Sequence, residues 1–546
     1  MTPSQPDPPA VVPAPPQAEA RELPALAFAG AEGAVRWAKG LALQSVANAY
    51  DAVHGQLKAL AAADFLPRER ATIAEVLRDP VVHLHTELAR RYAGKPQPAT
   101  GRELEASEQA IALWRAFWEQ YATCLKPLLE GDPELAGVKA KVLQRGLYVG
   151  KQLVLVHGLA RRVPPPWLWS ELHAYYRIAE LMECAATAIT DDLASSPGGV
   201  SCYSTYSHAL LLGLADPCAM SVKQVELADR WLGMWAHKVF PYPRQRDAEG
   251  PVILVDLDGK TGAVLAAAGP SNPPASLRFG SPGKLATSVR GRLKHLQTGA
   301  DPAELRLGHD CSIDQCTTLL GYLDARWYQV PRAPSATEAE RTDAIELCSG
   351  GLEAAYFRVG GRTFERKDPI GRFTFRDAAP LHAQGAVADY DRGREVAERA
   401  WPWESWRGTC GPREAVLDRA GDARQRWSLD QLAIVRGGSG VRVGCVTRVA
   451  LADDGGLALT LRLWSGSPVA IALRPQSAAP AEEPALPALL MAETAQDKPC
   501  LMLPPRSFHP SRILRTVDAV PERRFRLTRL LRRGADFERV AFEETA

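Results

Sequence analysis

Hydrophobic residues along the front half of the chain recur three or four positions apart, which is the period of an amphipathic helix. The clearest stripe is aromatic and consists of Trp114, Phe117, Trp118 and Tyr121. Farther along, hydrophobic and polar residues alternate in two runs, 441–447 and 457–463, on either side of a turn sequence at 453–456. Alternation on both sides of a turn predicts a β-hairpin with one buried face. The two periods together predict an α+β multidomain chain, with an α-helical N-terminal domain followed by a strand-rich C-terminal region.

These patterns divide the chain into segments with different expected structures. The expected boundaries are 1–28 for a proline- and alanine-rich arm, 29–240 for a helical domain, 241–326 for a mixed strand and helix connecting region, 327–475 for a strand-rich region, 476–487 for a linker and 488–546 for a C-terminal β block. The arm is expected to be disordered because it has nothing to bury. Within the strand-rich region, residues 352–359 are a further candidate strand. In the last block the expected strands are 489–491, 501–503, 513–517, 525–531 and 537–542.

Composition narrows the function classes. The chain has 546 residues, with 65 lysines and arginines against 63 aspartates and glutamates. This near-neutral balance argues against direct nucleic-acid binding through bulk charge. No run approaches the about 20 apolar residues that a transmembrane segment needs, and the beginning of the sequence lacks the features of an export signal. We therefore expect a cytoplasmic protein whose ten cysteines are reduced thiols.

Two short motifs have a chemical interpretation. Asp256-Leu257-Asp258-Gly259 follows an apolar run and resembles the acidic loop of phosphatases that use an aspartyl nucleophile and magnesium. An Asp-Gly hairpin turn explains these residues better, because no partner set for a phosphatase follows. The second motif is a tight cluster of His309, Cys311 and Cys316. A zinc site needs four ligands, so core thiols at a helix start are the favoured interpretation, and we expect neither catalytic residues nor a metal site.

Near the C-terminus, arginines are concentrated. They are Arg523, Arg524, Arg526, Arg529, Arg532 and Arg533. Alternation in a strand would place Arg524 and Arg526 on one face and the hydrophobic residues between them on the other. A solvated edge strand is favoured over a site for a phosphate-bearing partner, because nearby carboxylates dilute the charge.

Several pieces of the strand-rich region resemble a known family. The pieces are 327–332, Arg341, 345–354, 416–421, 432–436 and the hairpin 443–463. They resemble PilZ-type proteins, which are small β-barrel receptors for cyclic di-GMP. The resemblance is strongest to a group of large proteobacterial proteins that carry a helical N-terminal region before a diverged PilZ-like barrel. It implies a β-barrel-like, PilZ-like fold for residues 327–475, and the strands from Ala488 onward are similar to the tail of that group.

The resemblance also implies a ligand site for cyclic di-GMP. In such a site arginines grip the phosphates and stack on the guanines, and a short Asp-x-Ser-x-x-Gly turn supplies polar contacts and a close backbone approach. Carried onto this chain, the ligand-binding candidates are Arg332, Arg341, Arg413 and Asp418. The two family arginines are separated by three residues, whereas Arg332 and Arg341 are nine positions apart. Ala420 and Ala423 stand where the turn has serine and glycine, so the expected site is degenerate.

The expected function is that of a cytosolic, non-enzymatic signalling protein. The degenerate barrel would bind cyclic di-GMP and relay the signal to an unknown protein partner through the helical domain, with no other cofactor. Two alternatives stay open. One is a metal-dependent phosphatase-like enzyme that uses Asp256 and Asp258. The other is a ligand-independent protein–protein scaffold.

Overall fold

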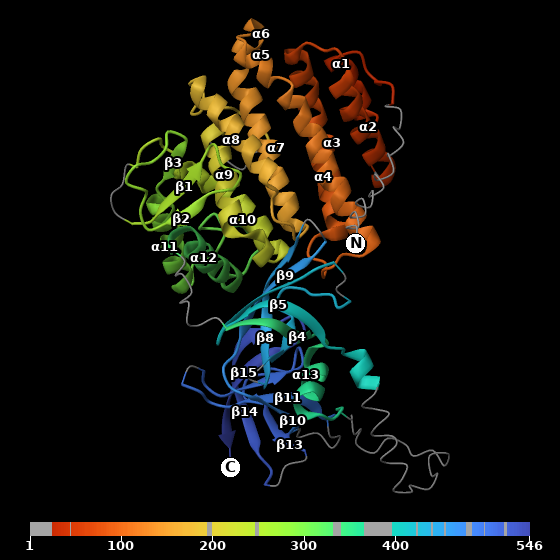
Figure 1. Cartoon of the computed structure of the whole chain (residues 1–546), viewed down its shortest axis with the longest axis vertical. Helices are drawn as coiled ribbons and strands as arrows, with labels where there is room; N and C mark the ends of the chain where they lie inside the picture. Colours follow the sequence, from red (N-terminus) through yellow and green to blue (C-terminus); the bar gives the residue numbers. More distant parts are fainter. Residues whose placement is uncertain are drawn as a thin grey trace, which may run out of the picture.

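A computed structural model gives the arrangement of the chain. It describes residues 24–43, 45–193, 199–245, 250–330, 340–364, 396–421, 424–437, 440–452, 455–476, 483–495, 497–517 and 521–545. A helical domain, a first barrel and a second barrel follow one another along the long axis (Figure 1). The predicted class, α+β with a helical front and barrel-like sheets behind, is confirmed. Most of the expected N-terminal arm lies outside the described residues.

The helical domain is built around one long central helix. Its helices are α1 (Ala31–Lys39), α2 (Val46–Ala62), α3 (Pro67–Tyr92), α4 (Gly101–Ala122), α5 (Leu125–Leu129), α6 (Pro133–Ala136), α7 (Lys139–Leu159), α8 (Pro166–Leu181), α9 (Cys202–Ala215) and α10 (Val222–Trp235), with short 3-10 turns η1 (Pro217–Ala219) and η2 (Ala236–Lys238). The predicted aromatic stripe lies on α4 and is buried. Helix α7 lies between α4 on one side and α8 to α10 on the other (Figure 1).

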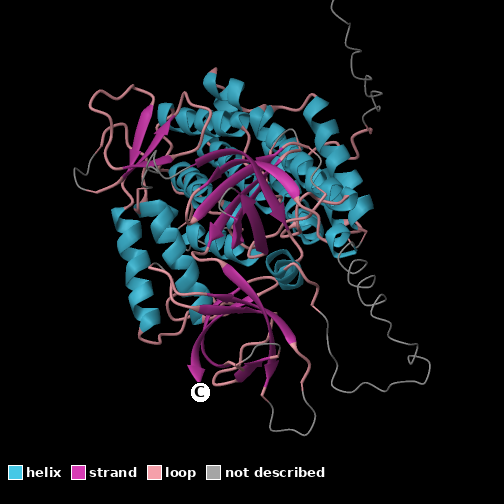
Figure 2. Ribbon diagram, turned by 60° about the horizontal axis from the view of Figure 1, so that its bottom comes forward, coloured by secondary structure: helices cyan, strands magenta, loops and turns pink. Residues whose placement is uncertain are grey.

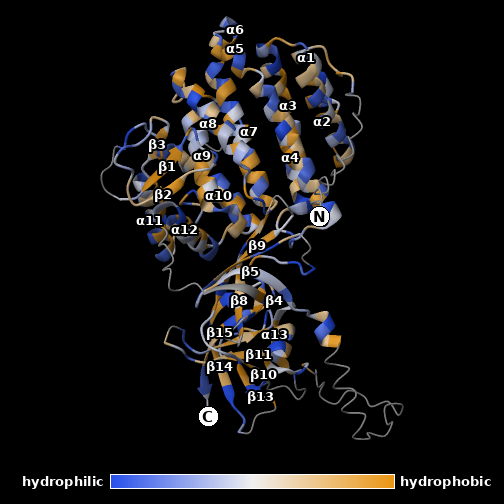
Figure 3. Ribbon diagram, in the orientation of Figure 1, coloured by the Kyte–Doolittle hydropathy of each residue, from blue (hydrophilic) through white to orange (hydrophobic). Residues whose placement is uncertain are grey.

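Glycines on α7 allow α8 to approach closely. A Cβ atom at Gly146 would lie 2.0 Å from Cε1 of Tyr175, and one at Gly150 would lie 2.5 Å from Cδ2 of Leu172. The backbone of α7 therefore serves as the surface on which side chains of α8 pack. Hydrophobic residues of these helices belong to one large core (Figure 3).

The connecting region packs against this helical core. It contains a sheet of β1 (Val252–Asp256), β2 (Val264–Ala266) and β3 (Leu277–Gly280), in the order β2-β1-β3 with antiparallel pairing, followed by α11 (Gly283–Gln297) and α12 (Ile313–Tyr328). The last turn of α12 is anchored by Trp327, whose Nε1 donates to the carbonyl of Leu211 on α9 over 2.9 Å. Strands were expected from about Trp327 onward, but α12 continues to Tyr328 because Trp327 completes its buried face.

The first barrel contains the predicted hairpin. Its strands are β4 (Glu340–Cys348), β5 (Glu404–Cys410), β6 (Glu414–Arg419), β7 (Leu432–Gly437), β8 (Gly440–Leu451) and β9 (Leu457–Leu463). They close in the order β4-β5-β6-β9-β8-β7, with antiparallel pairing throughout. Alternate residues of β9 point inward, and Trp406 and Trp427 meet edge to face in the barrel core, with ring centroids 6.2 Å apart.

The second barrel follows directly. Its strands are β10 (Pro468–Pro475), β11 (Leu486–Met491), β12 (Cys500–Leu503), β13 (Ile513–Thr516), β14 (Arg524–Arg533) and β15 (Glu538–Thr545), closed in the order β10-β11-β12-β15-β14-β13. Figure 2 shows the strands of both barrels from a second direction. Strand β10 pairs with β11, so the strands of this barrel begin before the segment 476–487 that was expected to be a linker.

One predicted strand is wrong. Residues 352–359 lie in the helix α13 (Gly351–Gly360) rather than in a strand. Gly350 and Gly351 have φ values of 124° and 65°, which end β4 and turn the chain into the helix. Leu352 and Ala355, three positions apart, are buried in a hydrophobic cluster that includes residues of both barrels. The apolar residues of this short run therefore serve a helix that packs between the barrels.

Candidate functional site

The structure places three of the four predicted ligand-binding residues on the first barrel. Arg341 is in β4, with its Cα atom opposite that of Thr409 on β5. Asp418 is near the end of β6, is exposed, and lies opposite Arg407 of β5. Arg413 precedes β6, and its carbonyl accepts a hydrogen bond of 2.8 Å from the amide of Leu463. Arg332 and Ala423 are outside the described residues.

The predicted residues do not all come together. Arg413 precedes β6 and Asp418 lies near its end, so at about 3.4 Å per residue their Cα atoms are separated by roughly 17 Å. Along the strand direction Arg341 lies between Arg413 and Asp418, because its partner Thr409 pairs in turn with Val416 of β6. The geometry thus favours a face of β4, β5 and β6 around Arg341 and Asp418.

Sequence reasoning missed Arg407 on this face. It is exposed, and its Cα atom is the register partner of Asp418, which brings a guanidinium-bearing residue beside the predicted acidic position. Cross-strand neighbours become apparent only when strand pairing is known, so no local motif could have identified Arg407.

A second motif with an acidic residue spans the end of β4 and the start of α13. Glu346, Cys348 and Gly351 have the spacing of the acid, hydroxyl and glycine sought at Asp418. The carboxylate of Glu346 pairs with Arg436 over 2.5 Å, and the Arg436 guanidinium lies 4.5 Å from the ring centroid of Trp403. Glu346 is therefore already engaged by an arginine, whereas Asp418 is exposed.

The segment after Asp418 is held by one buried carboxylate. Glu404, which is 5 % exposed, pairs with Arg419 over 2.8 Å. It also accepts hydrogen bonds of 2.8 Å from the amides of Arg424 and Gln425. Glu404 thus holds both the side chain of Arg419, next to Asp418, and the backbone of the loop that follows.

This loop joins the barrel to the helical domain. The amide of Trp427 donates to the carbonyl of Gln97 over 2.6 Å, and the amide of Gln97 donates back over 2.7 Å. Arg426 donates to the carbonyl of Pro98 over 3.0 Å and pairs with Glu103 of α4 over 2.5 Å. Because the Trp427 ring is buried in the barrel core, this joint connects that core directly to the helical backbone.

A second contact between the same two parts lies on β8. Arg448 Nε donates to Oδ2 of Asp216 over 2.8 Å, and the amide of Leu451 donates to the carbonyl of Arg161 over 2.6 Å. Burial opposes the charge of Arg448, but Asp216 raises the pKa of the guanidinium above its ordinary value. The barrel is therefore attached to the helical domain at two separate points.

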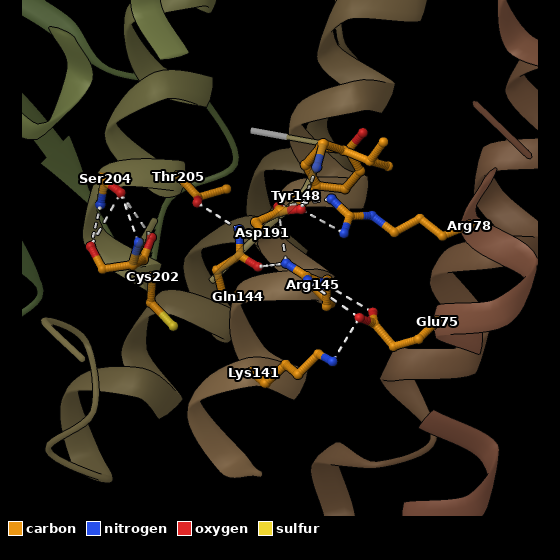
Figure 4. Close-up of polar contacts among 12 residues, drawn as sticks. Glu75, Arg78, Lys141, Gln144, Arg145, Tyr148, Asp191, Cys202, Ser204 and Thr205 are labelled. Atoms are coloured by element: carbon orange, nitrogen blue, oxygen red, sulfur yellow. Dashed lines mark hydrogen bonds and ion pairs between the residues drawn. The ribbon is translucent and has the colours of Figure 1, made fainter. Parts of the chain in front are cut away.

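Inside the helical domain, a buried ion network connects α3, α7 and the segment before α9 (Figure 4). Asp191 pairs with Arg78 over 2.7 Å and with Arg145 over 3.0 Å, and all three side chains are at most 6 % exposed. Glu75 accepts from the other side of Arg145 over 2.8 Å. Each of these carboxylates is paired with cations inside the network. We therefore interpret the network as a structural support rather than a ligand site.

Comparison with known proteins adds a family to this geometry. Residues 32–242 match the family described as "Cyclic-di-GMP receptor FimW, N-terminal domain". The helical domain is FimW-like. The match confirms the resemblance to cyclic di-GMP receptors that the sequence indicated. Neither a curated protein nor a solved structure matches the chain.

The acidic motif beside the FimW-like domain forms a turn. Asp258 donates its amide to Oδ1 of Asp256 over 3.1 Å, and the amide of Gly259 donates to the carbonyl of Asp256 over 3.0 Å. The exposed Asp258 carboxylate pairs with Arg177 over 2.6 Å. The surrounding strands are antiparallel, and β1 and β2 on either side of this loop pair with each other. The predicted Asp-Gly turn is confirmed.

The cysteine cluster also lies against the FimW-like domain. Cys316 is buried in α12, and its Sγ atom is 3.0 Å from Sγ of Cys311, in agreement with the prediction of thiols at a helix start. Within the part of the chain that the structure describes, no three His, Cys, Asp or Glu side chains are grouped so as to hold a metal ion. Over the same residues, none of the helices is long and apolar enough to cross a membrane.

The C-terminal arginines lie far from the FimW-like domain, in the second barrel. Arg524 and Arg526 are exposed and Phe525 is buried, as alternation predicted. Arg523 pairs with Glu544 over 2.8 Å, and Arg526 pairs with Glu543. These ion pairs across β14 and β15 account for much of the local positive charge.

Proposed function

We propose that the chain is a cyclic di-GMP receptor that holds its ligand on the first barrel and relays binding to the FimW-like domain. The single observation that carries the proposal is the family match of the helical domain, because the matched description is that of a cyclic di-GMP receptor. The closed barrel that follows has the architecture that the PilZ resemblance implied.

The ligand would bind on the face of β4, β5 and β6. Arg407 supplies a guanidinium group for a phosphate, and a guanidinium can bind a phosphate through two parallel hydrogen bonds. The backbone of Arg341 lies on the neighbouring strand, opposite Thr409. Asp418 offers a carboxylate to the N–H donors on a guanine edge. Arg413 lies before β6, away from Asp418, and Arg332 stays a candidate from the resemblance alone.

The relay would run through the loop after β6. A ligand that moves Asp418 also moves Arg419, and Glu404 ties Arg419 to the backbone that leads to Arg426. Arg426 and its neighbour Trp427 contact the helical domain directly. The helical domain would then present a changed surface to a protein partner.

Calorimetric titration of the full chain with cyclic di-GMP tests this proposal. We expect saturable heat, and a loss of affinity of about tenfold or more for Asp418→Ala and for Arg407→Ala, because each removes a charge-assisted hydrogen bond. The matched control is Arg524→Ala, which removes an exposed arginine from the second barrel. Absence of heat at millimolar ligand would contradict the proposal and leave a ligand-independent scaffold.

A further inference from the structure

Two adjoining cavities lie beside η2, away from the barrels. One has a volume of about 560 Å³ and is bounded by η2, β1 and β3. The other has a volume of about 800 Å³ and is bounded by the start of α9, η2 and α11. Tyr203, His237 and Lys238 line both cavities, and we call the two together the η2 groove.

The η2 groove is electropositive. Lys238, Lys284, Arg292 and Arg306 line it, and no aspartate or glutamate is among its described lining residues. Lys238 Nζ and Arg292 Nη1 both donate to the hydroxyl oxygen of Ser288, over 2.6 Å and 2.7 Å. Two cations that share one neutral acceptor lie close together without a carboxylate between them.

The pKa shifts of Lys238 and Arg292 agree with two positive charges held close together. Burial lowers the pKa of Lys238, and the positive charge of Arg292 lowers it further. Burial likewise lowers the pKa of Arg292, with a second contribution from Arg306. Each cation thus repels its neighbour, and an anion placed among them would relieve both the repulsion and the loss of hydration.

Aromatic rings line the other part of the η2 groove. The ring of Phe240 lies 4.5 Å from that of Tyr203 and 4.5 Å from that of Tyr242, measured between centroids. The Phe240 and Tyr242 rings are inclined by only 29°. All three residues are half-buried, so the short ladder is a ready surface for a planar group.

We propose that the η2 groove binds a nucleotide, with the phosphate held by Lys238 and Arg292 and the base stacked on the aromatic ladder. Cations without carboxylate partners suit a phosphate, and bases stack on aromatic side chains whatever their identity. The two combined cavities leave room for both groups. This site is separate from the barrel face and does not depend on the proposed function.

Equilibrium binding to the full chain tests the site, with GTP, cyclic di-GMP and inorganic phosphate as probes. We expect at least one of the two nucleotides to bind, more tightly than inorganic phosphate and more weakly as salt is raised. The double variant Lys284→Glu/Arg306→Glu changes exposed lining residues and should weaken this binding about tenfold or more. The matched control Lys294→Glu, also exposed and also on α11 but outside the groove, should not.

Three results would overturn the proposal. One is no binding of either nucleotide, and a second is that neither nucleotide binds more tightly than inorganic phosphate. The third is binding that survives the double variant unchanged. The Asp418→Ala variant separates this site from the barrel. It should weaken only the binding to the barrel, and if it removes all nucleotide binding the η2 groove is not a site.

Discussion

Replacing Arg426 with alanine should loosen the joint between the first barrel and the helical domain. Arg426 donates to the carbonyls of Pro96 and Pro98 and pairs with Glu103, over 2.6, 3.0 and 2.5 Å. Its side chain is 36 % exposed, so water would recover part of what is lost. Buried charge-assisted hydrogen bonds contribute about 1.5–3 kcal/mol each, and exposed ion pairs contribute about 0–1 kcal/mol. For the partly exposed Arg426 we therefore expect the substitution to destabilise the closed joint by about 2 kcal/mol. That figure corresponds to a roughly 30-fold larger open population.

Hydrogen exchange measures this opening directly. The amides of Gln97 and Trp427 donate to each other's carbonyls across the joint, so their exchange requires it to separate. In Arg426→Ala both amides should exchange about 30-fold faster, while amides in the middle of α7 keep their rates. Arg524→Ala is the control and should change neither amide. Unchanged exchange at Gln97 and Trp427 would refute the reasoning that Arg426 holds the joint closed.

Three further predictions concern stability. Asp191→Asn leaves two buried arginines without their shared carboxylate and should lower the free energy of unfolding by about 3–5 kcal/mol in chemical denaturation. Asp258→Asn, at an exposed ion pair, should leave the free energy of unfolding nearly unchanged. Gly146→Ala should lower the melting temperature, since its Cβ would overlap the Tyr175 ring, and an unchanged temperature would contradict that packing. Burial raises the pKa of Asp536 to about 6, so its contribution to stability is present at low pH and is lost as pH rises through about 6. Asp536→Asn should remove this loss and raise the free energy of unfolding by about 2 kcal/mol at pH 8. Equal dependence of stability on pH in the variant and the unaltered chain would contradict this prediction.

Strong local periodicity made much of the fold predictable. The alternation over β8 and β9 specified a hairpin, and the aromatic stripe specified α4, because each pattern extends over several turns or residues. The run at 352–359 was too short for its period to be decisive, and its helix depends on two glycines with positive φ and on burial between the barrels. Closure of the barrels could not be predicted from local sequence patterns either. It depends on the pairing of β4 with β7 and of β10 with β13, which are separated by long stretches of chain.

The candidate site was predictable only in part. Asp418 and Arg341 could be proposed from the PilZ resemblance because both lie in the pieces of sequence that resemble that family. Arg407 could not, because its place beside Asp418 depends on strand register. The contact of Trp427 with Gln97 joins residues 330 positions apart and leaves no trace in either local sequence. The η2 groove likewise brings together cations and rings from η2, α9 and α11 that have no common motif.

Hydrogen exchange of the full chain with and without cyclic di-GMP tests the central claim most directly. The account predicts slower exchange in β5 and β6, where the ligand binds, and a simultaneous change at Gln97 and Trp427, where the barrel meets the helical domain. Protection confined to the barrel would contradict the relay. No change on the first barrel at saturating ligand would contradict the account as a whole.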